Sequence, residues 1–141
     1  MKISIGSDHA GFELKQKIIQ KYSSFEFNDC GTFSNKSVDY PDFGHEVAKS
    51  LLNNNIDYGI VVCGSGIGIS IAANRNKGIR AALCTSTEHA KLSRLHNDAN
   101  VLALGSRLTN EKDIYAIIDI FFATSFEGGR HSDRIKKIDY I

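Results

Sequence analysis

Residues 58–73 read Tyr-Gly-Ile-Val-Val-Cys-Gly-Ser-Gly-Ile-Gly-Ile-Ser-Ile-Ala-Ala and are the most informative segment of the chain. An apolar run ends at Cys63, a glycine-rich turn covers residues 64–68, and a second apolar run follows. This order is typical of a β-strand, a tight turn and an α-helix. The N-terminus of a helix stabilises negative charge, whether on a bound oxyanion, a phosphate or a thiolate. The stretch therefore predicts a loop that holds an anion next to a reactive thiol.

Three known types of glycine loop can be compared with residues 63–69. A P-loop requires a glycine followed by Lys-Ser or Lys-Thr, and the chain has no such sequence. A dinucleotide-binding turn of the form Gly-x-Gly-x-x-Gly would need a glycine at Ile69, and a cysteine phosphatase loop would need an arginine there. The stretch therefore favours a small anion or an oxyanion over a nucleotide.

Apolar runs alternate with helical patterns along the rest of the chain. Residues 114, 117, 118, 121 and 122 are all Ile or Phe, and their spacing is that of one face of a clear final helix. Strands are predicted at residues 2–6, 25–30, 58–63, 79–84 and 101–104, with helical patterns between them. The alternation predicts an α/β fold with three α/β/α layers and a five-stranded parallel sheet, doubly wound and Rossmann-like.

Composition narrows the class of protein further. The 141 residues are enough for one domain, and 42% of them are hydrophobic, which is enough for a sizeable core. The net charge of +1 gives no general attraction for nucleic acid or an anionic membrane, and no apolar run is long enough to span a bilayer. The three cysteines form no Cys-x-x-Cys motif, which favours a reducing, cytoplasmic location. We expect Cys30 and Cys84 to be buried apolar residues.

Functional sites in folds of this class lie at the carboxyl ends of the strands. Asp8 and His9 follow the first predicted strand, although Asp8 is equally suited to capping the next helix. His96 ends a predicted helix, where a histidine can also be a simple partner of the helix dipole. Arg130 and Arg134 are four residues apart, so a helical tail would place both on one face, where their guanidinium groups would suit a phosphate.

Six blocks of the sequence, in this order, resemble one family. They are residues 6–11 (Gly-Ser-Asp-His-Ala-Gly), 39–42 (Asp-Tyr-Pro-Asp), 63–74, 78–81 (Gly-Ile-Arg-Ala), 96–107 and 126–131 (Phe-Glu-Gly-Gly-Arg-His). Over nearly its whole length the chain resembles ribose-5-phosphate isomerase type B, within the sugar-phosphate isomerases that also include galactose-6-phosphate isomerase subunits. The resemblance implies an aldose–ketose isomerase of the non-oxidative pentose phosphate pathway.

The resemblance also implies a role for each matching residue. Cys63 is expected to be the base that moves a proton between C1 and C2 through an enediolate, with Ser65 assisting and N–H groups of residues 64–68 stabilising the oxyanion. His96 is expected to open the sugar ring. The implied substrate-binding residues are Asp8, His9, Tyr40, Gly64, Ser65, Gly66, Ile67, Gly68, Asn97, Arg107, Arg130 and Arg134, with the arginines and His9 near the phosphate.

The same resemblance implies a homodimer with its sites at the subunit interface, where the segment with His96 and Asn97 comes from the partner of the chain that carries Cys63. No metal and no cofactor are expected, and the five histidines include no His-x-x-x-His or His-Glu-x-x-His pair. The role of His131 stays open. The expected domain covers residues 1–141, and its C-terminal tail, residues 125–141, carries the phosphate-site arginines.

Three alternatives remain at this point. The substrate could be a six-carbon sugar phosphate, allose 6-phosphate or galactose 6-phosphate. The chain could instead be a domain that binds a sugar phosphate without turnover, although this interpretation gives no reason for a thiol at the head of the anion loop. A nucleotide-binding fold of similar outline is disfavoured because the glycine motifs fail.

Overall fold

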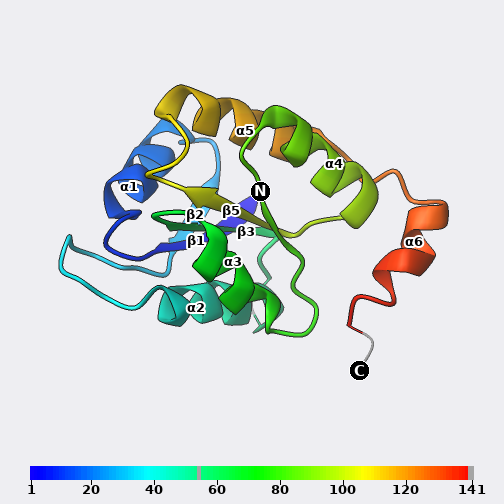
Figure 1. Cartoon of the computed structure of the whole chain (residues 1–141), viewed down its shortest axis with the longest axis horizontal. Coiled ribbons are helices and arrows are strands. Elements are labelled where there is room, and N and C mark those ends of the chain that lie inside the picture. Colours follow the sequence, from blue (N-terminus) through cyan, green and yellow to red (C-terminus); the bar gives the residue numbers. More distant parts are fainter. Residues whose placement is uncertain (54, 140–141) are drawn as a thin grey trace.

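The computed structural model describes residues 1–53 and 55–139, and Figure 1 shows its arrangement. Strands and helices alternate along the chain. In order they are β1 (Lys2–Ser7), α1 (Phe12–Lys21), β2 (Glu26–Asp29), α2 (Tyr40–Asn53), β3 (Tyr58–Cys63), α3 (Ile67–Asn74), β4 (Ala81–Leu83), α4 (Thr87–Asn97), β5 (Val101–Gly105), α5 (Glu111–Ala123) and α6 (Arg130–Ile135).

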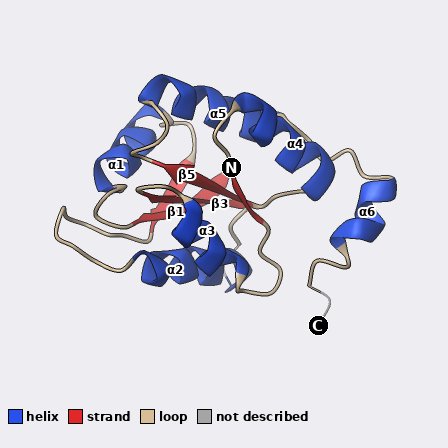
Figure 2. Ribbon diagram, in the orientation of Figure 1, coloured by secondary structure: helices blue, strands red, loops and turns tan. Residues whose placement is uncertain are grey.

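The five strands form one parallel sheet in the order β2-β1-β3-β5-β4. Helices α1, α4 and α5 cover one face of the sheet, and α2 and α3 cover the other, so the molecule has three layers (Figure 2). The predicted α/β class and the doubly wound parallel sheet are confirmed. The order of the strands reverses between β1 and β3, and open α/β sheets bind ligands beside such a reversal, at the carboxyl ends of the strands.

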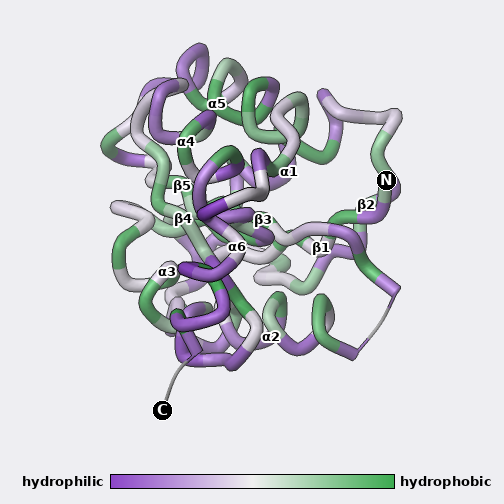
Figure 3. Tube along the Cα trace, turned by 90° about the vertical axis from the view of Figure 1, so that its right-hand side faces the viewer, coloured by the Kyte–Doolittle hydropathy of each residue, from purple (hydrophilic) through white to green (hydrophobic). Residues whose placement is uncertain are grey.

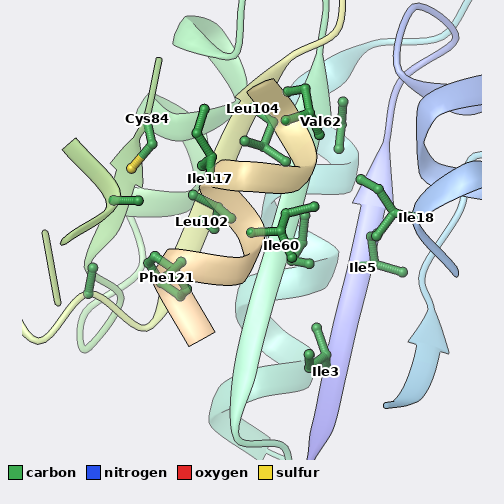
Figure 4. Close-up of a cluster of buried hydrophobic side chains, with 14 residues drawn as sticks. Ile3, Ile5, Ile18, Ile60, Val62, Cys84, Leu102, Leu104, Ile117 and Phe121 are labelled. Atoms are coloured by element: carbon green, nitrogen blue, oxygen red, sulfur yellow. The ribbon is translucent and has the colours of Figure 1, made fainter. Parts of the chain in front are cut away.

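Each face of the sheet has its own hydrophobic core. On one face, Ile117 and Phe121 of α5 pack over Ile60 and Leu102 of the central strands (Figure 4). On the other face, residues of α2 and α3, including Val47, pack against β3 and β5. Hydrophobic and hydrophilic residues alternate around α2 and α5, because each of these helices buries one side and exposes the other (Figure 3).

The largest differences from the predicted elements concern the fourth strand and the end of the chain. The fourth strand covers only Ala81–Leu83. Ile79 and Cys84, which lie just beyond its two ends, are also buried, so the apolar run that predicted the strand is longer than the strand itself. The helix at residues 111–123 is followed by α6, which contains both Arg130 and Arg134. Among the described residues, no helix is long and apolar enough to cross a membrane.

Candidate active site

Cys63 is the last residue of β3, and its side chain is only 4% exposed. The loop that follows turns back on the thiol, so that the N–H of Gly66 donates a hydrogen bond to Cys63 Sγ at 3.1 Å. This hydrogen bond fixes the position of the sulfur relative to the backbone of the loop. The sequence predicted a thiol at the head of an anion loop, and the structure places Sγ in direct contact with this loop.

The loop depends on the backbone conformation of Gly66, which precedes α3 with φ +78°. A Cβ atom at this position would lie 2.6 Å from Cδ1 of Leu83 and 2.8 Å from the carbonyl carbon of Leu104. The N–H of the next residue, Ile67, donates to Ser65 Oγ at 3.1 Å. Two of the N–H groups predicted to stabilise an oxyanion are therefore already bonded within the loop.

Asp8 lies beside Cys63 because β1 pairs with β3. The N–H of Asp8 donates to the carbonyl of Val62 at 3.2 Å, and Asp8 Oδ1 accepts from the N–H of Gly11 at 3.1 Å. The capping interpretation of Asp8 was wrong, because Gly11 is the N-cap of α1 and no side chain caps this helix. Asp8 instead bonds within the turn between β1 and α1, at the carboxyl edge of the sheet. Asp8 is buried, with 6% of its surface exposed, and the hydroxyl of the preceding Ser7 is buried without a hydrogen-bond partner among the described residues.

Three further predicted residues lie around this loop. His9 is half-buried, and its Nδ1 accepts a hydrogen bond from the N–H of Val38 at 3.2 Å, so Nε2 carries the proton in the neutral ring. The Tyr40 ring lies so close to Gly68 that a side chain at that position would overlap it. The side chain of Arg107 is exposed, and its Nη1 would lie 3.4 Å from a Cβ on Gly64. The carboxyl edge therefore combines the thiol, an aromatic wall and a guanidinium group.

The remaining predicted residues form a second group. A cavity of about 300 Å³ is lined by His96, Asn97, His131, Arg134, Ile135 and Ile138. Arg130 is the first residue of α6 and is exposed one turn before Arg134. Figure 1 shows α6 beside the end of α4, on the opposite side of the molecule from the cyan loop that follows β2.

This second group lies at the amino edge of the sheet. Helix α4 ends at Asn97, and three residues later the carbonyl of Asn100 accepts a hydrogen bond from the N–H of Gly59, at the start of β3. Cys63 lies four residues further along β3, which at the usual strand rise is roughly 13 Å away. Within one chain, the fold therefore does not bring His96 to the thiol.

His96 has a close partner that the sequence left open. Its ring stacks on that of His131, with ring centroids 4.4 Å apart and planes at 18°. His131 is buried, and its Nε2 has no hydrogen-bond partner among the described residues. Burial lowers the pKa of His131, and the adjacent His96 lowers it further.

Glu127 completes this cluster, with a carboxylate oxygen 4.0 Å from His96 Nε2. One candidate ligand atom from each of His96, Glu127 and His131 lies within 4.8 Å of the others. Short histidine motifs do not reveal this cluster, because its two histidines are far apart in the sequence. Imidazole lone pairs lie in the plane of the ring. Because these two rings are nearly parallel, the geometry is that of a stacked pair, and the expectation of a metal-free reaction remains a prediction.

Comparison with known proteins gives consistent results. The family model described as Ribose/Galactose Isomerase matches residues 3–138. The chain is 44% identical to ribose-5-phosphate isomerase B of Escherichia coli, over 99% of this chain and 95% of that protein, and 48% identical to a putative sugar phosphate isomerase of Rickettsia bellii, over 97% and 96%. A ribose 5-phosphate isomerase structure from Thermotoga maritima superposes with a TM-score of 0.96 at 51% identity, covering 99% of this chain and 98% of that one. The type B enzyme of Trypanosoma brucei gives 0.94 at 44%, covering 98% and 96%.

Proposed function

Because the chain belongs to the ribose/galactose isomerase family, we propose that it interconverts ribose 5-phosphate and ribulose 5-phosphate, with Cys63 as the base. The observation that carries the mechanism is the hydrogen bond from the Gly66 N–H to Cys63 Sγ, which holds the sulfur at the head of the glycine loop, at the carboxyl edge of the sheet. This reaction would place the chain in the non-oxidative pentose phosphate pathway. The free thiols of Cys30, Cys63 and Cys84 agree with the expected cytoplasmic location.

The chemical step starts from the open-chain aldose. The Cys63 thiolate removes the proton from C2, the electron pair forms the C1–C2 double bond, and negative charge develops on O1. The other N–H groups of residues 64–68 stabilise this charge, since those of Gly66 and Ile67 are bonded within the loop. The thiol then returns the proton to C1, and O2 loses its hydroxyl proton as the C2 carbonyl forms. Ser65, whose hydroxyl lies in the same loop, assists the movement of the proton between O1 and O2.

The ring must open before this step, and we assign the opening to His96 of a second copy of the chain. His96 and Asn97 lie at the amino edge of the sheet, so they can complete the Cys63 site only from another subunit. Ile67 and Ile71 support an interface near the thiol, since they are one turn apart on α3 and are about half exposed despite being large and apolar. In the resulting homodimer, each site would combine Cys63 of one subunit with His96 of the other.

The phosphate would bind between the two groups of residues. His9 and Arg107 lie on the side of the thiol, and Arg130 and Arg134 project from α6 on the side of His96. Guanidinium groups bind phosphate through paired hydrogen bonds, which fixes the end of the sugar remote from the reacting carbons. Tyr40 would form the wall beside the sugar, since its ring packs against Gly68.

The proposal is tested by measuring ribulose 5-phosphate formation from ribose 5-phosphate by the purified chain, with EDTA present. We expect turnover. We expect Cys63→Ala to reduce kcat by at least about 100-fold, which is the lower end of the rate enhancement that a general base usually provides, with little loss of substrate affinity. Cys30→Ala is the matched control, because Cys30 is half-buried just after the edge strand β2, with β1 between it and β3, and should not affect turnover.

The outcomes separate the alternatives. Turnover of allose 6-phosphate or galactose 6-phosphate alone would retain the mechanism and replace the substrate. Binding of ribose 5-phosphate without turnover of any sugar phosphate, in folded dimeric protein, would support a binding domain. A monomer with full activity would contradict the shared site, since one chain would then have to supply both Cys63 and His96.

A further inference from the structure

Arg80 belongs to the block at residues 78–81 that the family resemblance includes but that the proposed reaction does not use. It directly precedes β4, at the amino edge of the sheet, and its side chain is 21% exposed. Its main chain is held by Asn100, whose Oδ1 accepts from the Arg80 N–H at 2.7 Å and whose N–H donates to the Arg80 carbonyl at 3.1 Å. The backbone from which the Arg80 side chain extends is therefore held in place.

The Arg80 guanidinium binds the end of the helix that carries His96. Its Nε donates to the carbonyls of Asn97 and Asp98, both at 3.1 Å, and its Nη2 donates to the Asp98 carbonyl at 3.0 Å. Nη2 also lies 3.5 Å from a carboxylate oxygen of Asp98. Carbonyls at the C-terminus of a helix lack partners within the helix and carry its negative dipole end, so a cation here satisfies both needs.

The bound segment has a backbone that needs support. Asp98 caps α4 in the left-handed conformation, with φ +44°, which is uncommon for a residue other than glycine. Its carboxylate also binds Arg94 at 2.8 Å, and Arg94 is buried among Tyr58, Phe121 and the carbonyl of Ala99. Arg94 thus joins the segment to the core, while Arg80 holds it from the side that faces solvent.

We propose that Arg80 is a positioning residue for the reaction, holding the carbonyls of Asn97 and Asp98 so that His96 and Asn97 are presented at a fixed angle to the partner's substrate. This inference rests on the proposed function, in which His96 acts across the subunit interface. Small displacements of a catalytic group are costly, since about 1 Å can reduce a rate by about 100-fold. A side chain that contacts no substrate can therefore control the rate through this segment.

The test uses Arg80→Gln, which removes the charge and the forked donors, and Arg80→Lys, which retains the charge alone. We expect Arg80→Gln to lower kcat for ribose 5-phosphate by about 10- to 100-fold with a smaller change in KM, and Arg80→Lys to recover only part of the loss. Arg75→Gln is the matched control, because Arg75 is an exposed arginine five residues earlier, and it should retain the normal kcat.

A double-mutant cycle separates positioning from general destabilisation. If Arg80 acts through His96, the Arg80→Gln substitution should cost less than about threefold when His96 is already replaced by alanine. Equal losses in both backgrounds, or a loss no greater than that of Arg75→Gln, would overturn the proposal. Thermal unfolding of each variant shows whether the dimer and the fold persist, and Arg80→Lys remains available if Arg80→Gln does not fold.

A second readout does not depend on activity. In the wild type, ring protons of His96 should show nuclear Overhauser contacts to the stacked ring of His131, and Arg80→Gln should weaken these contacts while leaving the resonances of His45 and His89 unchanged. Unchanged His96 contacts would overturn the positioning role. If the wild type converted no ribose 5-phosphate, the proposed function would fail, and this measurement would still decide whether Arg80 orients His96.

Discussion

Replacing Gly66 by alanine should destabilise the protein through two separate effects. The residue before α3 has φ +78°, where a side chain costs about 1 to 2 kcal/mol. The added Cβ would also lie 2.6 Å from Leu83 Cδ1 and 2.8 Å from the Leu104 carbonyl carbon, and overlap of this kind in a packed interior costs about 1 to 3 kcal/mol. Together the two effects lower the free energy of unfolding by about 2 to 5 kcal/mol.

The assay is thermal unfolding followed by circular dichroism. With an unfolding entropy of about 2.1 cal/mol/K per residue, the Tm of the 141-residue chain falls by about 3.4 °C per kcal/mol, so Gly66→Ala should lower Tm by about 7 to 17 °C. Gly128→Ala is the matched control, because Gly128 has φ +73° but no described atom within 4 Å of an added Cβ. The control keeps the backbone cost alone and should lose about 3 to 7 °C. Equal decreases in Tm for both variants would refute the overlap argument.

Two further predictions concern the effects of burial on titration. Burial raises the pKa of Cys84 to about 11, so iodoacetamide should label Cys84 in the folded protein at pH 8 at least about 100-fold more slowly than a free cysteine, as followed by peptide mass spectrometry; labelling at the rate of the unfolded chain would contradict this. The lowered pKa of His131 means that the unfolded chain binds more protons below about pH 6.5, so urea midpoints should fall as the pH decreases from 7.5 to 5. This decrease should be smaller in His131→Gln, and an identical pH dependence in both proteins would show that other groups cause it.

Much of the fold followed from local patterns. The strand at residues 58–63 was predicted with its observed bounds, because a buried parallel strand is a continuous apolar run that ends at a glycine turn. The fourth strand was predicted too long, because the buried residues Ile79 and Cys84 extend the apolar run beyond Ala81–Leu83, although the N–H of Cys84 still bonds to the Ala103 carbonyl of β5. The short helix after Gly129 was expected only as one possible form of the tail, because its six residues bury little besides His131.

The sequence predicted one part of the candidate site better than the other. Asp8, Cys63 and Arg107 each lie at the carboxyl end of a strand, and parallel strands bring these ends together, so their assembly could be expected from the sequence. The stacking of His96 on His131 joins residues 35 positions apart through the docking of α6 beside α4, and no spacing rule reports such a contact. Arg80 was similarly part of a recognisable block, but its hydrogen bonds to the end of α4 could not be predicted from its neighbours.

Local sequence was sufficient to predict which segments form strands and helices, which of their faces are buried, and that a thiol precedes a glycine loop. These properties depend on the periodicity of side chains and on backbone conformations over a few residues. The tertiary structure alone decided the strand order β2-β1-β3-β5-β4, the contact of the Gly66 N–H with Cys63 Sγ, and the location of His96 at the opposite edge of the sheet. Those features depend on packing between distant segments, and many pairings of the same helices and strands would satisfy the local patterns equally well.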